Sequence, residues 1–157
     1  VKLLLEKYVI YVFSCRNDML AKLDALLKTR VGSMEWECEP PISGILVGET
    51  PKELRREIKA SYNVIFTNYA FTRVGINIPH ATASIYASPY KVNGKQINGR
   101  ILRSNDSIVR RYIDIVDENT SLKTQLNSRI PDYLERKFEV EYLEYAAPLA
   151  KIPRKKN

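Results

Sequence analysis

Residues 8–32 read YVIYVFSCRNDMLAKLDALLKTRVG, and this stretch decides the fold class. Its first six residues form a continuous apolar run of aromatic and β-branched side chains, which is typical of a strand buried on both faces. Asn17 then offers a helix N-cap, and leucines follow at helical spacing towards Gly32, which favours a helix that ends just before that glycine. The stretch therefore predicts a buried strand followed directly by a helix.

The same alternation continues along the chain. Thr50 and Glu53 have the spacing of a capping box, with a proline between them in the first helical turn. Residues 95–103 have helical character, and a later helix is expected to begin at Thr120 and to stop at Pro131. Beyond that proline the pattern fits a strand and a helix equally well. Further short apolar runs predict strands at residues 45–47, 63–67, 83–87 and 112–116.

Repeated strand–helix units with apolar strands imply an α/β fold. We expect a parallel sheet of five or six strands with helices on both faces. No internal repeat, low-complexity tract or linker divides the chain, so residues 1–150 are read as one domain. The basic segment at residues 151–157 is expected to be a disordered tail.

Composition excludes several classes of protein. The chain has 157 residues, 45% hydrophobic and 27% charged, which is typical of a globular domain. No apolar run reaches the roughly 18 residues that a membrane span needs, and the charged pair Glu6 and Lys7 argues against a signal peptide. Two cysteines and one histidine are too few for a four-ligand zinc site or a disulfide framework. We therefore expect an intracellular protein without a metal site of its own.

The positive charge is concentrated in one part of the sequence. The net charge is +7, and residues 61–157 carry fifteen Lys and Arg against nine Asp and Glu. Residues 61–105 contain five basic residues and no acid. Such a stretch inside a folded domain favours a surface that meets anions, for which nucleic acid is the main candidate.

The acid-free stretch also contains the most specific motif, QINGRILR at residues 96–103. On a helix, Gln96, Gly99, Arg100 and Arg103 share one face, where the two guanidiniums form a fork suited to phosphate oxygens. The small residue at position 99 allows a ligand or another backbone to approach closely.

These residues carry a resemblance to superfamily 2 helicases. QINGRILR resembles their last motif, QxxGRxxR, at all four fixed positions, and FTNYAFTRVGINIP at residues 66–79 resembles the preceding motif. YVIYVFSC resembles the strand that opens their second, C-terminal RecA-like domain. Within the superfamily, the chain is most similar to helicases of large cytoplasmic DNA viruses, such as the African swine fever virus proteins and the poxvirus transcript-release helicases. The fold implied is a RecA-like three-layer sandwich.

The resemblance implies roles for the matched residues around ATP. Arg103, with Arg100, would reach the γ-phosphate of an ATP held mainly by an absent first RecA-like domain, together with Mg²⁺, and would assist hydrolysis as arginine fingers. Gln96 would help to close the cleft around the nucleotide, and Gly99 is counted with it among the nucleotide-binding residues. The expected binders nearer the sugar and phosphates are Gly75 and Asn77, the latter standing where many members have Asp.

The resemblance also implies a nucleic-acid contact. Thr67 at the end of a strand would contact strand phosphates, together with Ser14, Arg16 and Arg73. The family match therefore predicts the second motor domain of an ATP-dependent helicase, inactive alone, with a nucleic-acid strand and its own N-terminal RecA-like domain as partners. The sequence leaves open whether that strand is DNA or RNA. For a viral member, the location would be the host cytoplasm or the virion.

A complete ATP site is missing from the sequence. The nearest imitation of a phosphate loop, GILVGET at residues 44–50, has the wrong spacing and places Glu49 where the lysine belongs. No acid pair of the DExH kind follows a strand to hold magnesium.

Two alternative functions remain open. A non-catalytic nucleic-acid-binding module would use the same basic face, and would bind strongly as an isolated chain with a salt slope of about −0.7 per phosphate contacted. A metal-dependent nuclease is the weaker alternative, because its PD and ExK elements at Pro131–Asp132 and residues 135–137 are too close together. Asp114 and Asp117 at a strand end are better explained by helix capping and by charge balance with Arg110 and Arg111.

Overall fold

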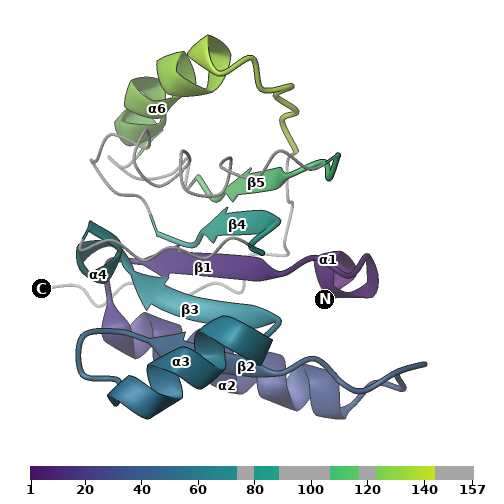
Figure 1. Ribbon diagram of the computed structural model, residues 1–157. Helices are drawn as coiled ribbons and strands as arrows, with labels where there is room; N and C mark the ends of the chain where they lie inside the picture. Colours follow the sequence, from purple (N-terminus) through teal and green to yellow (C-terminus); the bar gives the residue numbers. More distant parts are fainter. Residues whose placement is uncertain (74–79, 89–106, 117–122, 144–157) are drawn as a thin grey trace, which may run out of the picture.

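The computed structural model describes residues 1–73, 80–88, 107–116 and 123–143 of the chain. The strands in this part form one sheet in the order β2-β3-β1-β4-β5, and every neighbouring pair is parallel (Figure 1). Their bounds are β1 (Ile10–Ser14), β2 (Ser43–Leu46), β3 (Val64–Asn68), β4 (Ala83–Tyr86) and β5 (Arg111–Asp114). The predicted α/β class with a parallel sheet is confirmed.

Helices cover both faces of this sheet. Their bounds are α1 (Lys2–Leu5), α2 (Asn17–Gly32), α3 (Lys52–Ser61), α4 (Tyr69–Arg73) and α6 (Lys123–Glu135). Figure 1 shows α2 and α3 on opposite sides of the sheet, and α6 beside the edge strand β5. The short helices α1 and α4 were not anticipated, because four or five residues are too few to show a helical period.

The core consists of two apolar layers separated by the sheet. Side chains alternate along β1: Tyr11 and Phe13 join one layer with Ile58 of α3, whereas Ile10 and Val12 join the other with Leu20 of α2. Every residue of β1 is buried, as the apolar run predicts for a central parallel strand. The helix-covered layers hold the strand ends, and therefore the loops that follow them, in fixed positions.

Two predicted helix starts are wrong. α2 begins at Asn17 with Arg16 in the N-cap position, and it includes Gly32. α3 begins after Pro51, without a side-chain cap. The hydroxyl of Thr50 instead accepts a hydrogen bond from Val47 N at 3.0 Å and donates to Ile45 O at 3.2 Å. The hydroxyl of Thr50 therefore stabilises the turn that follows β2 and does not cap α3.

The last helix also departs from the prediction. Pro131 lies inside α6 instead of stopping it, and the helix continues to Glu135. The ring of Pro131 is exposed, while Arg129, Asp132 and Tyr133 are buried on another side of α6. The contacts of this buried side therefore extend the helix past the proline. Within the described part of the chain, residues 138–143 form neither helix nor strand.

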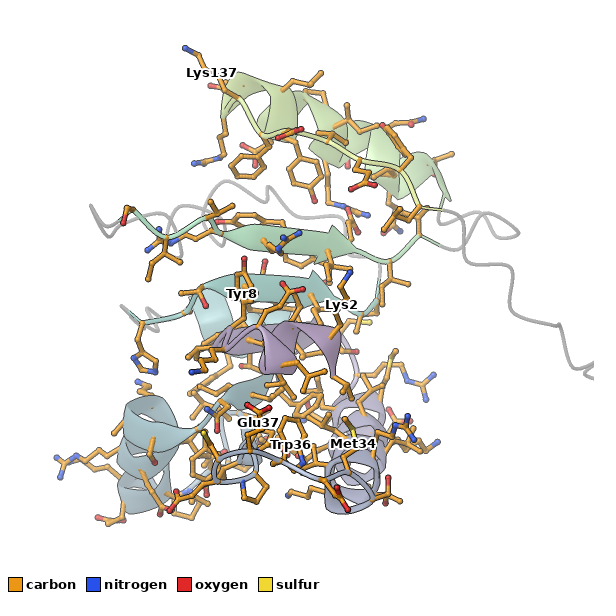
Figure 2. All side chains as sticks on the ribbon, turned by 90° about the vertical axis from the view of Figure 1, so that its right-hand side faces the viewer. Lys2, Tyr8, Met34, Trp36, Glu37 and Lys137 are labelled. Atoms are coloured by element: carbon orange, nitrogen blue, oxygen red, sulfur yellow. The ribbon has the colours of Figure 1, made fainter. Side chains whose placement is uncertain are left out.

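The amino edge of the sheet carries different side chains from the carboxyl edge. Figure 2 looks onto the amino edge, with Tyr8 and Lys2 at mid-height in the view and Trp36 below them. The hydroxyl of Tyr8 accepts a hydrogen bond from Arg111 Nε at 3.1 Å, which ties the start of β5 to the N-terminal segment.

Among the described helices, none is long and apolar enough to span a membrane.

Candidate functional site at the carboxyl edge of the sheet

Parallel strands end at the same edge of a sheet, and in open α/β sheets ligands bind there. Ser14 at the end of β1 is paired with Asn68 at the end of β3, and Phe13 is paired with Tyr86 at the end of β4. The residues that follow these three strands therefore lie side by side. Arg16 lies just after β1, and the predicted contacts Ser14 and Thr67 lie in the last two residues of β1 and β3.

Two asparagines join the ends of β1 and β3. Asn68 accepts a hydrogen bond from Phe71 N at 2.7 Å through Oδ1, which caps the start of α4. Its Nδ2 donates to Asn17 Oδ1 at 2.9 Å across the edge. Sequence reasoning missed Asn68, although an asparagine directly after a buried strand is a recognisable capping signal.

Arg16 presents its guanidinium at this edge. The side chain is 66% exposed and pairs with Asp18, with Nε–Oδ1 and Nη2–Oδ2 distances of 3.0 Å and 2.6 Å. The hydrogen bond from Arg16 lowers the pKa of the Asp18 carboxyl, so that carboxylate stays charged and holds the guanidinium in a forked contact. An incoming phosphate could reach Arg16 but would compete with Asp18 for it.

Ser14 and Thr67 do not present their hydroxyls to the surface. Both side chains have an exposed fraction of 0%. Thr67 Oγ1 donates to Leu46 O at 2.7 Å, and Ser14 Oγ donates to Met19 Sδ at 3.4 Å while accepting from Arg16 N at 3.2 Å. In this arrangement neither hydroxyl is available for a direct contact with a phosphate.

The remaining predicted site residues are not described by the structure. Arg73 ends α4, but the position of its side chain is outside the described part. The residues assigned to the nucleotide all lie outside the described ranges: Gly75, Asn77, Gln96, Gly99, Arg100 and Arg103.

The most buried carboxylates in the described part, those of Asp24, Asp114 and Asp132, are paired with cations. Asp114 at the end of β5 accepts two hydrogen bonds from Arg129, from Nε at 2.7 Å and from Nη2 at 2.9 Å, and one from the hydroxyl of Tyr133 at 2.9 Å. The explanation of Asp114 by charge balance with Arg110 and Arg111 is therefore wrong. Among the described residues, no three His, Cys, Asp or Glu side chains gather as metal ligands.

The nuclease alternative does not fit the geometry either. Pro131, Asp132 and Glu135 all belong to the single helix α6, and Asp132 is paired with Arg136 at 3.1 Å. One helix cannot supply the hairpin on which separated acidic groups converge. The phosphate-loop imitation is likewise structural: Gly44 lies in β2, where an added Cβ would be 2.5 Å from the ring of Tyr62.

The sequence comparison gives one group of relatives. No family model matches the chain. An 82-residue stretch, 51% of the chain, is 34% identical to the protein named "Putative ATP-dependent RNA helicase QP509L" of African swine fever virus, isolate Pig/Kenya/KEN-50/1950. The strain Badajoz 1971 Vero-adapted gives the same match. The matched part spans only 16% of the viral protein's length.

The structure comparison gives the same kind of domain. The chain superposes on the C-terminal part of the Fun30 ATPase domain with a TM-score of 0.62 and 14% identity, covering 80% of this chain and 40% of that one. The C-terminal domain of the DEAD-box protein Dbp5 gives a TM-score of 0.60 and 16% identity, with 85% and 72% covered. Sequence and fold together thus confirm the resemblance of this chain to the C-terminal RecA-like domain of superfamily 2 helicases, of a viral type.

Proposed function

We propose that this chain is the second motor domain of an ATP-dependent nucleic-acid helicase, and that its strand is RNA. The observation that carries the proposal is the motif QINGRILR, which follows β4 of a RecA-like sheet in the order that the helicase pattern requires. The viral relative is named as an RNA helicase, which supports RNA over DNA. Its viral source supports a protein that acts inside an infected cell, in the cytoplasm or packaged in the virion.

The ATP-facing role belongs to the motif. Arg103 and Arg100 complete the triphosphate site from one wall of a cleft and stabilise the charge that develops on the transferred phosphoryl group, an effect of about 10³ to 10⁵ in rate. Gln96 and Gly99 close the cleft around the nucleotide, and Gly75 and Asn77 lie near its sugar and phosphates.

An N-terminal RecA-like domain of the same protein supplies the rest of the ATP site in this proposal. It holds ATP and the magnesium ion that neutralises its phosphates. This assignment agrees with the pairing of Asp114 and Asp132, which are engaged with Arg129 and Arg136. The chain alone is then expected to hydrolyse ATP too slowly to be useful.

The nucleic-acid role belongs to the carboxyl edge of β1 and β3. Arg16 offers an exposed guanidinium, and the bridged amides of Asn17 and Asn68 offer neutral hydrogen-bonding groups beside it. Thr67 and Ser14 support this edge from inside, and Arg73 follows at the end of α4. Backbone phosphates are the groups that such side chains recognise without regard to base sequence.

Replacing Arg103 by alanine tests the proposed function. In the protein that joins this chain to its N-terminal domain, Arg103→Ala should reduce RNA-stimulated ATP hydrolysis at least about a hundredfold, because the transition state loses its guanidinium. Steady-state kcat and the KM for ATP are measured with saturating single-stranded RNA. The matched control is Arg30→Ala, which removes an exposed arginine in the last turn of α2, at the opposite edge of the sheet.

The outcomes separate the two open functions. A large loss of kcat in Arg103→Ala with normal turnover in Arg30→Ala supports the motor domain. Normal hydrolysis in Arg103→Ala contradicts it and leaves the non-catalytic binding module, for which tight, salt-dependent binding of RNA by the isolated chain is the positive sign.

A further inference from the structure

Three buried hydroxyl residues and the backbone N–H of an exposed cysteine join the ends of β1 and β4. We call Ser14, Cys15, Tyr69 and Ser88 the edge node. Cys15 N donates to Ser88 Oγ at 2.9 Å, and Ser88 Oγ donates onward to Ser14 Oγ at 3.2 Å. The hydroxyl of Tyr69 donates to Ser88 O at 2.8 Å. The node therefore ties the first residue after β3 and the residues after β1 to a single point, Ser88.

The hydroxyl of Tyr69 is placed more specifically than packing requires. Its ring packs against the rings of both Phe13 and Tyr86, at centroid distances of 5.8 Å and 6.4 Å, and these contacts need only a phenyl group. Burial raises the pKa of Tyr69, so the hydroxyl stays protonated and keeps donating at physiological pH. By contrast, the buried hydroxyl of Tyr11, in the same apolar layer, has no hydrogen-bond partner among the residues that the structure describes.

The edge node lies between the two halves of the proposed site. Cys15 is followed directly by Arg16 and Asn17 at the nucleic-acid edge. Ser88 is followed directly by the segment of the chain that carries Arg103. The ends of β1 and β4 are therefore linked by short hydrogen bonds, so a displacement of one strand end is expected to shift the other.

We propose that Tyr69 and Ser88 are positioning residues, which hold the end of β4 in a fixed place relative to the nucleic-acid edge and so set the starting point of the arginine-finger segment. This inference rests on the proposed function. A displacement of about 1 Å in a group that acts in the transition state can reduce the rate about a hundredfold, so small shifts at Ser88 matter. The node acts on kcat, because the arginines that it places act in the transition state.

Tyr69→Phe tests the proposal, since it keeps the stacked ring and removes the hydrogen bond from the hydroxyl to Ser88 O. We expect kcat of RNA-stimulated hydrolysis to fall about tenfold in the protein that contains both motor domains, a milder loss than that caused by removing an arginine finger. The KM for ATP and the RNA concentration for half-maximal stimulation should stay within about twofold of their wild-type values. Ser88→Ala, which removes the contacts to Cys15 and Ser14, should have the same effect.

Tyr11→Phe is the matched control. It makes the same chemical change on the same face of the sheet, but it removes a hydroxyl that has no hydrogen-bond partner within the described part of the chain. Its kcat should equal that of the wild type. In the double variant Tyr69→Phe/Ser88→Ala, the losses should not multiply, because both residues act through one point.

Each outcome decides the inference. A tenfold loss of kcat with unchanged KM in Tyr69→Phe, and none in Tyr11→Phe, supports it. A normal kcat in Tyr69→Phe overturns it, and so does a loss of kcat that appears equally in Tyr11→Phe. A loss of kcat that is absent at temperatures below the unfolding transition of the variant also overturns it, because unfolding then explains the loss. If Arg103→Ala itself hydrolyses ATP normally, the proposed function has failed, whatever the tyrosine variants do.

Discussion

The hydroxyl of Thr67 contributes to the sheet from inside. It donates to Leu46 O at 2.7 Å between β3 and β2, and the side chain is completely buried. A buried carbonyl that loses such a partner costs free energy, whereas an exposed one is compensated by water. At the scale of the residue, the primary effect of Thr67 is therefore on stability, and its effect on RNA binding passes through the geometry of the edge.

Thr67→Val should lower the free energy of unfolding by about 1–3 kcal/mol, because valine has the same shape and leaves the Leu46 carbonyl without this partner. Urea unfolding of the chain measures the change. Thr29→Val is the matched control: the hydroxyl of Thr29 bonds Ala25 O on an exposed face of α2, and its loss should cost less than about 0.5 kcal/mol. Equal effects in the two variants would remove the structural role of the Thr67 hydroxyl.

The helix α6 is held to β5 by a polar contact. The side chain of Arg129 is 7% exposed and that of Asp114 is 12% exposed, and they form a two-pronged ion pair that also receives the hydroxyl of Tyr133. After the helix ends, Phe138 stacks on Tyr112 of β5 at 4.7 Å. At the scale of the element, one charge pair and one ring pair thus fix α6 on the edge strand.

Asp114→Asn should destabilise the chain by about 3–5 kcal/mol, because it removes the negative charge that pairs with the buried guanidinium of Arg129. Asp18→Asn, which breaks an exposed pair, should cost less than about 1 kcal/mol. Chemical denaturation gives both values. In hydrogen exchange, the α6 amides of Asp114→Asn should exchange faster than those of the wild type, whereas the β1 amides should exchange at the wild-type rate. A loss no larger than that of Asp18→Asn would show that the pair does not hold α6.

One apolar layer of the molecule is rich in tyrosines. Tyr11, Tyr69 and Tyr86 lie in it, and Tyr112 is packed against it. Burial raises the pKa of each of these hydroxyls, and that of Tyr112 rises to about 12. A group with a higher pKa in the folded than in the unfolded state stabilises fully below its unfolded pKa, and this contribution is lost as the pH rises through the folded pKa.

The free energy of unfolding should therefore decline from about pH 10 towards pH 12, where unfolded tyrosines ionise and the buried ones resist. Urea unfolding at intervals of pH measures the decline. In Tyr112→Phe the free energy of unfolding should fall less steeply with pH over this range. The difference in slope corresponds to at most one proton released per molecule on unfolding. A pH profile identical in the two proteins would contradict the assignment of this linkage to Tyr112.

Charge is also distributed at the scale of the whole molecule. Glu35, Glu37 and Glu39 are exposed in the segment after α2, and Figure 2 shows Glu37 at the amino edge of the sheet. The carboxyl edge instead presents Arg16 and the chain that leads to the acid-free motif. Acids placed at the far edge leave the field at the carboxyl edge favourable to an anionic strand.

Local patterns in the sequence were sufficient for the parallel sheet, the central strand β1 and the helicase resemblance, because apolar periodicity and fixed motif spacing involve neighbouring residues. Helix ends were predicted less well, since Thr50 and Pro131 depend on what lies against them. Thr50 bonds the β2 turn, and α6 passes Pro131 because its buried side is held on β5. No local pattern contains the partner of such a residue.

The sequence by itself thus determined the class of fold and the alternation of its strands and longer helices, and it predicted which residues meet phosphate. Only the tertiary structure decided that Thr67 and Ser14 face inward, that Asn68 bridges to Asn17, and that Tyr69 meets Ser88. The physical reason is the separation of the partners along the chain. Ser88 lies 73 residues from Cys15, and only the folded sheet brings Cys15 N to 2.9 Å from Ser88 Oγ.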